Sequence, residues 1–203
     1  MFAKKNDTPQ KEKVTYTWQQ NISLYLHDMV YMLVIVMLLL MLFFRVIVVD
    51  GPSMENTLLN GDYMLLVSNL FYKEPQPGDV VVVSKQAYDN GKPIVKRVIA
   101  TEGQVVDIDF NEGVVYVDGI ALDEPYTKTL TTLKQGNTFP QTVEDGCVFI
   151  MGDNRNNSKD SRSPQIGQVD KREVLGKVIC LLFPGTGMGG TQARDFNRIG
   201  AVK

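Results

Sequence analysis

The sequence predicts a mainly β protein, in which one N-terminal transmembrane helix precedes an antiparallel β domain. Two observations support this fold class. Residues 29–44 form an apolar run without a charged side chain, and from Tyr63 onward short apolar stretches alternate with turn residues. Long helical periodicity is absent after the apolar run. The 203 residues suit one membrane anchor and one globular domain of ordinary size.

The apolar run is long enough to cross a bilayer. Arg45 interrupts it, but an arginine side chain can reach the headgroups, so the span continues through Val49 and covers about 20 residues, enough for roughly 30 Å of hydrocarbon. A cleaved signal peptide would have an apolar core of about 7–15 residues and a small-x-small site, which residues 48–52 lack. A buried helix of a soluble protein is the other alternative, which the apolar side chains on all faces disfavour. We therefore predict a transmembrane anchor over residues 28–49.

Basic residues indicate the orientation of this anchor. Lys4, Lys5, Lys11 and Lys13 precede it, and no comparable cluster follows it closely. Because positive residues stay on the cytoplasmic side, residues 1–27 should form a cytoplasmic segment. Residues 50–203 should form an extracytoplasmic β-rich domain, which makes the chain a single-pass protein of the cell membrane.

The strands of the outer domain follow from apolar runs and turn residues. Asp118-Gly119 predicts a hairpin, and residues 123–146 read as a polar surface excursion. The glycine-rich residues 185–190 read as a flexible loop. The predicted strands are Val80–Val83, Ile94–Ala100, Val105–Phe110, Val114–Val117, Cys147–Met151 and Val174–Leu182.

Composition excludes several classes of chemistry. The formal net charge of −2 makes no case for a nucleic-acid partner. Cys147 and Cys180 lie in apolar runs at no metal-ligand spacing, so we interpret them as small buried residues rather than a disulfide. The only histidine, His27, lies at the cytoplasmic end of the predicted anchor, which excludes a Ser-His-Asp triad and multi-histidine zinc sites in the outer domain. A hydrolase there would need Lys, Asp, Glu or a metal-bound hydroxide as its base.

Lys96 is a candidate for that base. In an extended strand it shares a face with Ile94 and Val98, while Arg97 points the other way. Burial disfavours the charged amine, and a base poised near neutrality needs a pKa about 2–4 units below the ordinary value of about 10.4. A lysine at a strand end that extends into solvent is the alternative.

Two further segments carry polar chemistry. Ser53 follows Asp50-Gly51-Pro52, where glycine permits a close backbone approach and proline stiffens it, as suits a nucleophile in a tight loop. An ordinary turn is the alternative. Residues 152–162 follow an apolar run and are dense in side chains that form directional hydrogen bonds, although an exposed polar loop would also explain them.

Together these segments resemble the type I signal peptidase family in its single-anchor, Gram-positive-like form. The resemblance covers most of the chain. No single motif is specific, but all of them in this order behind an anchor are very specific. The matching motifs are Ser53-Met54-Glu55-Asn56-Thr57-Leu58, Gly61-Asp62, Pro77-Gly78-Asp79-Val80-Val81, Lys96-Arg97-Val98-Ile99-Ala100 and Gly152-Asp153-Asn154-Arg155 through Asn157-Ser158 and Asp160-Ser161-Arg162.

The resemblance implies a membrane-bound serine endopeptidase that removes N-terminal signal peptides and needs no cofactor or metal. It implies that Ser53 attacks the scissile carbonyl, that neutral Lys96 transfers the proton and that the Ser53 N–H donates to the oxyanion. It implies that Ser158 orients the Lys96 ammonium and that Met54 lines a pocket for small side chains, at the first and third positions before the cut. The residues implied to hold the site together as charged pairs are Arg97, Asp153, Asp160 and Arg162.

The chain departs from the family pattern at two positions. The family usually has proline where this chain has Asn56, so the loop after Ser53 is expected to be less stiff. Some members have a serine where this chain has Gly51, which leaves one side-chain oxyanion donor fewer here.

Two other functions stay open. A self-cleaving repressor of the same Ser/Lys type is disfavoured by the anchor and by the lack of a DNA-binding helix pair. A catalytically silent, membrane-tethered β domain that binds a partner is disfavoured by the intact Ser53/Lys96 pair. The predicted partners are preprotein signal peptides and the lipid bilayer, with the secretion translocon as a further candidate and no nucleic acid.

Overall fold

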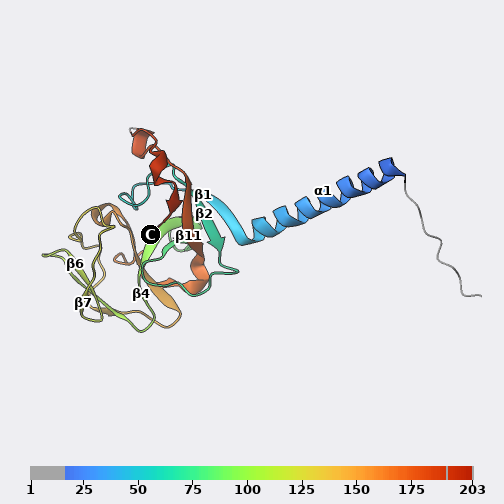
Figure 1. Ribbon diagram of the computed structural model, residues 1–203. Helices are drawn as coiled ribbons and strands as arrows, with labels where there is room; N and C mark the ends of the chain where they lie inside the picture. The colour runs from blue at the N-terminus through green and yellow to red at the C-terminus, as the bar shows by residue number, and fades with distance from the viewer. Residues whose placement is uncertain (1–16, 191, 203) are drawn as a thin grey trace, which may run out of the picture. The chain divides into compact units, whose positions relative to one another are not determined.

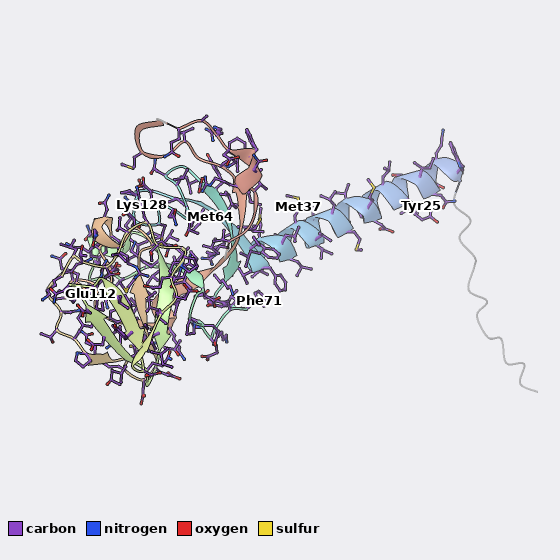
Figure 2. All side chains as sticks on the ribbon, turned by 60° about the vertical axis from the view of Figure 1, so that its left-hand side comes forward. Tyr25, Met37, Met64, Phe71, Glu112 and Lys128 are labelled. Carbon is purple, nitrogen blue, oxygen red and sulfur yellow. The ribbon has the colours of Figure 1, made fainter. Side chains whose placement is uncertain are left out.

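The computed structural model describes residues 17–190 and 192–202, and it divides into a unit up to Leu40 and a unit from Met41 onward. Helix α1 (Trp18–Phe43) makes up most of the described part of the first unit. Its side chains are exposed along its length, as Tyr25 and Met37 illustrate (Figure 2). With 26 residues and a mean hydropathy of 2.3 over its most apolar window, it is the one described helix that could cross a membrane by length and composition.

The helix differs from the expected anchor over residues 28–49 at both ends. It begins earlier because Thr17 and Gln20 form a reciprocal capping box, in which each side chain accepts from the other's backbone N–H (3.4 and 2.9 Å). It ends at Phe43 because the next residues form strand β1 (Phe44–Val48), whose β-branched Val46–Val48 pair with a neighbouring strand. The structure contains no membrane, so it does not test which part of the chain crosses one. The boundaries of the cytoplasmic segment (residues 1–27), the anchor (28–49) and the outer domain (50–203) therefore stay predictions.

The second unit contains two antiparallel sheets (Figure 1). The larger has the strand order β1-β2-β11-β3-β4-β9-β10, with β12 paired to β11, and the smaller has the order β7-β6-β5-β8. The other strands are β2 (Tyr63–Ser68), β3 (Val80–Val83), β4 (Ile94–Thr101), β5 (Val105–Asp109), β6 (Val114–Val117), β7 (Ile120–Ala121), β8 (Gln141–Thr142), β9 (Cys147–Met151), β10 (Val169–Asp170), β11 (Val174–Phe183) and β12 (Gly200–Ala201).

The structure confirms the fold class and the six strands predicted from apolar runs, with ends that differ by no more than a residue. Asp118 and Gly119 both have positive φ, as a two-residue hairpin requires, and they join β6 to β7. One buried cluster packs the smaller sheet against β4 and β9. A second lies under the β1–β2 connection and contains Val49, Met54, Leu58, Met64, Leu66, Val80, Val82 and Val178.

Candidate active site

Ser53 lies in the connection between β1 and β2, which we call the nucleophile loop (residues 49–62). Two backbone hydrogen bonds close its base, from Val49 N to Asp62 O and from Gly61 N to Val49 O, both 2.9 Å. Gly51 has a φ of +107°, a conformation that other residues rarely adopt, and its N–H donates to Asn60 Oδ1 at 2.8 Å. The loop therefore turns sharply just before Ser53.

Lys96 projects from β4 toward this loop. Its Nζ lies 2.8 Å from Ser53 Oγ and 2.9 Å from the Val95 carbonyl oxygen, and the residue is only 3% exposed. Burial lowers the pKa of Lys96 to about 8, while the nearby carboxylates of Asp160 and Asp153 oppose this shift. An amine at this distance with such a pKa can accept the serine proton near neutral pH. The alternative of a lysine extended into solvent is wrong for this structure.

Arg97 and Asp153 form a buried ion pair beside this dyad. Their side chains are 1% and 0% exposed and are joined by two hydrogen bonds, from Nε to Oδ1 (2.9 Å) and from Nη2 to Oδ2 (2.7 Å). Thr57 Oγ1 also donates to Asp153, and the Arg97 guanidinium lies 4.0 Å from the centre of the Tyr126 ring. Arg97 is buried although it points away from Lys96, because β4 is a central strand covered on both faces.

Asp160 and Arg162 form the second buried pair, through two hydrogen bonds of 2.8 Å to separate oxygens of Asp160. Asp160 also accepts from Gly152 N and from Ser158 Oγ, both at 3.0 Å. Ser158 therefore does not match the expectation that it orients Lys96. Its hydroxyl donates to Asp160, and within the described residues the hydrogen bonds of Lys96 Nζ are those with Ser53 and Val95.

A cavity of about 300 Å³ opens beside Ser53. Met54 is not among its lining residues, contrary to expectation: its side chain is fully buried, in the same core cluster as the lining residues Val49 and Val82. Sequence reasoning missed this lining, although the period of two of an extended chain, continued one residue past β1, places Ile47 and Val49 on one face. The lining residues are Ile47, Val48, Val49, Asp50, Ser53, Val82, Lys92, Pro93 and Val95.

Two asparagines hold the nucleophile loop in ways that the sequence did not suggest. Asn154 donates to Ser53 O from its backbone (3.0 Å) and to Pro52 O from its side chain (3.1 Å). Asn56 has a φ of +100°, which proline cannot adopt, and its amide donates to the Tyr126 and Thr127 carbonyls. The expected loss of stiffness at Asn56 is therefore offset by two hydrogen bonds.

The backbone around Ser53 is packed closely. A Cβ atom on Gly152 would lie 2.1 Å from Ser158 Oγ and 2.5 Å from Ser53 O, so only glycine fits there. Among the residues that the structure describes, the Ser53 N–H has no hydrogen-bond acceptor. A free N–H at Ser53 is the type of group that can donate to an oxyanion.

Comparison with known proteins places this arrangement in a family. Residues 22–183 match the family described as signal peptidase, peptidase S26. The chain is 36% identical over 148 residues to the probable signal peptidase I-1 of Synechocystis, covering 70% of this chain and 72% of that protein. It is 30% identical over 191 residues to signal peptidase I S of Bacillus subtilis, covering 89% and 95%.

A crystal structure of a signal peptidase I from Enterococcus faecalis has a TM-score of 0.43 and 28% identity, and it covers 52% of this chain and 97% of that one. The family match spans more than half of the chain and includes Ser53, Lys96 and both buried ion pairs. The chain therefore belongs to the signal peptidase family, peptidase S26, and is a hydrolase of the signal peptidase I type.

Proposed function

We propose that this protein removes N-terminal signal peptides from secreted preproteins, with Ser53 as nucleophile and neutral Lys96 as general base. The distance of 2.8 Å between Lys96 Nζ and Ser53 Oγ, with the amine buried, is the observation that carries the proposal. A neutral amine has one lone pair, which can accept the Ser53 proton while an N–H donates to Val95 O.

The reaction follows from this geometry. Ser53 Oγ attacks the scissile carbonyl as its proton moves to Lys96, and the Ser53 N–H donates to the oxyanion that forms. Lys96 then gives the proton to the leaving amine, which departs as the new N-terminus of the mature protein. Water attacks the ester on Ser53 as it gives a proton to Lys96. Lys96 then returns this proton to Ser53 Oγ, so the signal peptide leaves as a carboxylic acid and the hydroxyl and the neutral amine are restored.

The cavity beside Ser53 supports cleavage after small residues at the first and third positions before the scissile bond. Its volume of about 300 Å³ is modest, and Ile47, Val49, Val82 and Val95 make its walls largely apolar. These walls favour apolar side chains over charged ones, because a charge buried against them would lose its hydration.

Helix α1 supports attachment to the cell membrane as a single-pass anchor. A helix of 26 residues is about 39 Å long, which exceeds the hydrocarbon thickness of about 30 Å. The N-terminal lysines favour a cytoplasmic N-terminus and an extracytoplasmic catalytic unit. The lipid bilayer is then a partner of the chain. An interaction with the secretion translocon stays a prediction, whose only support is the proposed preprotein substrate.

Replacement of Ser53 by alanine should abolish cleavage of a preprotein in detergent, by roughly 10³-fold or more, because no other hydroxyl can form the ester. Mass spectrometry of the products measures this and also identifies the bond that the wild-type protein cuts. Ser68→Ala, a buried serine at the far end of β2, is the matched control and should keep full activity. Cleavage by Ser53→Ala would instead favour the silent binding domain, with another protease as the source of activity.

The pH dependence of kcat/KM should report the Lys96 amine. Because only the neutral amine accepts a proton, the rate should fall about tenfold for each pH unit below a pKa of about 8 and level off above it. Assays of a peptide substrate from pH 5 to pH 10 measure this profile. A flat profile between pH 5 and pH 9 would contradict a neutral lysine base.

A further inference from the structure

The family match ends at residue 183, yet the segment that follows returns to the nucleophile loop. We call residues 184–190 and 192–202 the C-terminal segment. Its strand β12 pairs with β11, placing Ala201 opposite Cys180, and Val202 packs against the core cluster under the loop. In Figure 1 the segment, in red, lies beside the blue-green loop that precedes β2. The segment is therefore placed to act on the loop that carries Ser53.

The first half of the segment packs directly on the loop backbone. Gly185 N donates to Asp62 Oδ1 at 2.6 Å, and Gly187 N donates to Asn60 O at 3.2 Å. A Cβ atom on Gly185 would lie 2.3 Å from Asn60 O, so the two backbones approach too closely for a side chain. This contact fixes the end of the nucleophile loop that leads into β2.

The second half contributes Arg198. Its guanidinium makes a bidentate pair with Asp62, at 2.6 Å to Oδ2 and 3.1 Å to Oδ1, and Nη2 also lies 3.3 Å from the Thr57 carbonyl oxygen. Asp62 is fully buried and also accepts from Leu59 N at 2.7 Å. A planar fork is suited to bridging a carboxylate and a carbonyl, which the single ammonium of lysine does less well. Arg198 thus joins residues 57 and 62 of the loop.

Arg198 contacts Thr57 and Asp62, and the loop residues between them are hydrogen-bonded to residues that precede and follow Ser53. Leu58 N and Thr57 N donate to the carbonyl of Met54, the residue after Ser53, at 2.8 and 3.1 Å. Asn60 Oδ1 accepts from Gly51 N, two residues before Ser53. The Thr57 side chain contacts Asp153, the partner of the arginine next to Lys96. A shift of residues 57–60 would therefore move Ser53 relative to Lys96.

We propose that Arg198 is a positioning residue, through which the C-terminal segment holds Ser53 within proton-transfer distance of Lys96. The proposal rests on the proposed Ser53/Lys96 dyad. Displacement of a reacting group by about 1 Å can cost roughly 10²-fold in rate, so a residue that acts through loop position should affect kcat more than substrate binding. The cavity beside Ser53 is lined by β1, β3, residues 92–95 and the first part of the nucleophile loop (Val49, Asp50 and Ser53). Arg198 contacts Thr57 and Asp62 at the other end of this loop and none of the lining residues.

Steady-state kinetics of the full-length protein in detergent test this, at a temperature well below the unfolding of every variant. Arg198→Ala should lower kcat by about tenfold or more while KM changes by less than about threefold. Arg198→Lys should lie between Arg198→Ala and wild type. Arg194→Ala is the matched control, since Arg194 lies in the same segment but contacts Pro184 O and the Phe183 ring, and it should keep kcat.

An unchanged kcat in folded Arg198→Ala, or an equal loss in Arg194→Ala, would overturn the proposal. Should Arg198→Ala fail to fold, Arg198→Lys decides: a lowered kcat at unchanged KM supports a positioning role, and wild-type kcat overturns it. Ser53→Ala, measured in parallel, separates the two proposals. If Ser53→Ala is inactive, the result for Arg198 bears on positioning alone, whereas activity in Ser53→Ala would overturn the dyad itself.

Discussion

Replacement of Lys96 by methionine should abolish cleavage and at the same time stabilise the fold. Loss of the proposed base should lower kcat/KM by roughly 10⁴-fold, since Lys96 is the amine that contacts the Ser53 hydroxyl among the described residues of the second unit. The stabilising effect follows because the charged amine is disfavoured in its buried site. A pKa lowered from 10.5 to about 8 corresponds to a penalty of roughly 3 kcal/mol on the charged form.

The sign of the stability effect depends on pH. Between pH 8 and pH 10.5 the unfolded chain binds the Lys96 proton while the folded protein does not, so wild-type stability rises with pH in this window. Below pH 8 both states are protonated and the folded protein carries the whole penalty. The advantage of Lys96→Met should therefore be about 3 kcal/mol at pH 7 and should shrink toward pH 10.5.

Denaturant unfolding in detergent at pH 7 and pH 10, with a peptide-cleavage assay, measures both effects. Lys134→Met is the matched control, because Lys134 is exposed and lies over the Phe110 ring away from the dyad. That variant should change neither activity nor the pH dependence of stability. Substantial activity in Lys96→Met, or a destabilisation of several kcal/mol at pH 7, would contradict a buried amine that is costly to charge.

Replacement of Asp153 by asparagine should strongly destabilise the fold. It removes the carboxylate charge from the buried pair with the Arg97 guanidinium, which is 1% exposed, and breaking a buried pair in this way costs about 3–5 kcal/mol. For a domain of this size the loss corresponds to a fall in Tm of roughly 10 °C. Because Asp153 raises the pKa of Lys96, its loss should also move the acid limb of the pH–rate profile to lower pH.

Arg172→Ala provides the control for this prediction. The Arg172 side chain is 90% exposed, and its pair with Asp170 should contribute little to stability because solvent screens it. Thermal unfolding should therefore give a Tm for Asp153→Asn that lies several degrees below the Tm of Arg172→Ala. Equal Tm values would show that burial does not set the strength of the Arg97–Asp153 pair.

Local sequence patterns predicted the strands well because each strand is specified by its own apolar residues and turns. Val80–Val83 and Cys147–Met151 are covered on both faces, and such strands appear as continuous apolar runs. The end of the N-terminal helix could not be predicted in this way. Val46–Val48 are equally apolar in a helix or a strand, and pairing with β2, which lies more than ten residues away, decides between them.

The site residues also fall into two groups: some can be identified from a local motif, and others are placed by contacts between residues far apart in the sequence. Ser53 and Lys96 could be named because their motifs are local, and the absence of a suitable histidine narrowed the choice of base. Their neighbours depend on contacts between distant loops. Ser158 turns to Asp160 rather than Lys96, Met54 turns into the core rather than the cavity, and Arg198 reaches the loop across more than 130 residues of sequence.

The contact between a buried amine and the Ser53 hydroxyl is the feature on which the proposed chemistry depends. Burial makes Lys96 a usable base near neutral pH, at a cost in stability of the kind that active sites often impose. The carboxylates of Asp160 and Asp153 limit this lowering of the Lys96 pKa because they favour the charged amine, whereas the nearby Arg162 lowers the pKa further. The site therefore balances desolvation against nearby negative charge.

Titration of the Lys96 amine by NMR decides whether it can serve as this base. Selective isotope labelling of lysine side chains, with Lys96→Met to assign the signal, allows the Lys96 resonance to be followed from pH 6 to pH 11. We expect a midpoint near pH 8, separated from those of the exposed lysines. A midpoint near 10.5, the ordinary lysine value, would leave only a few parts in ten thousand of Lys96 neutral at pH 7, too little for it to act as the base for Ser53.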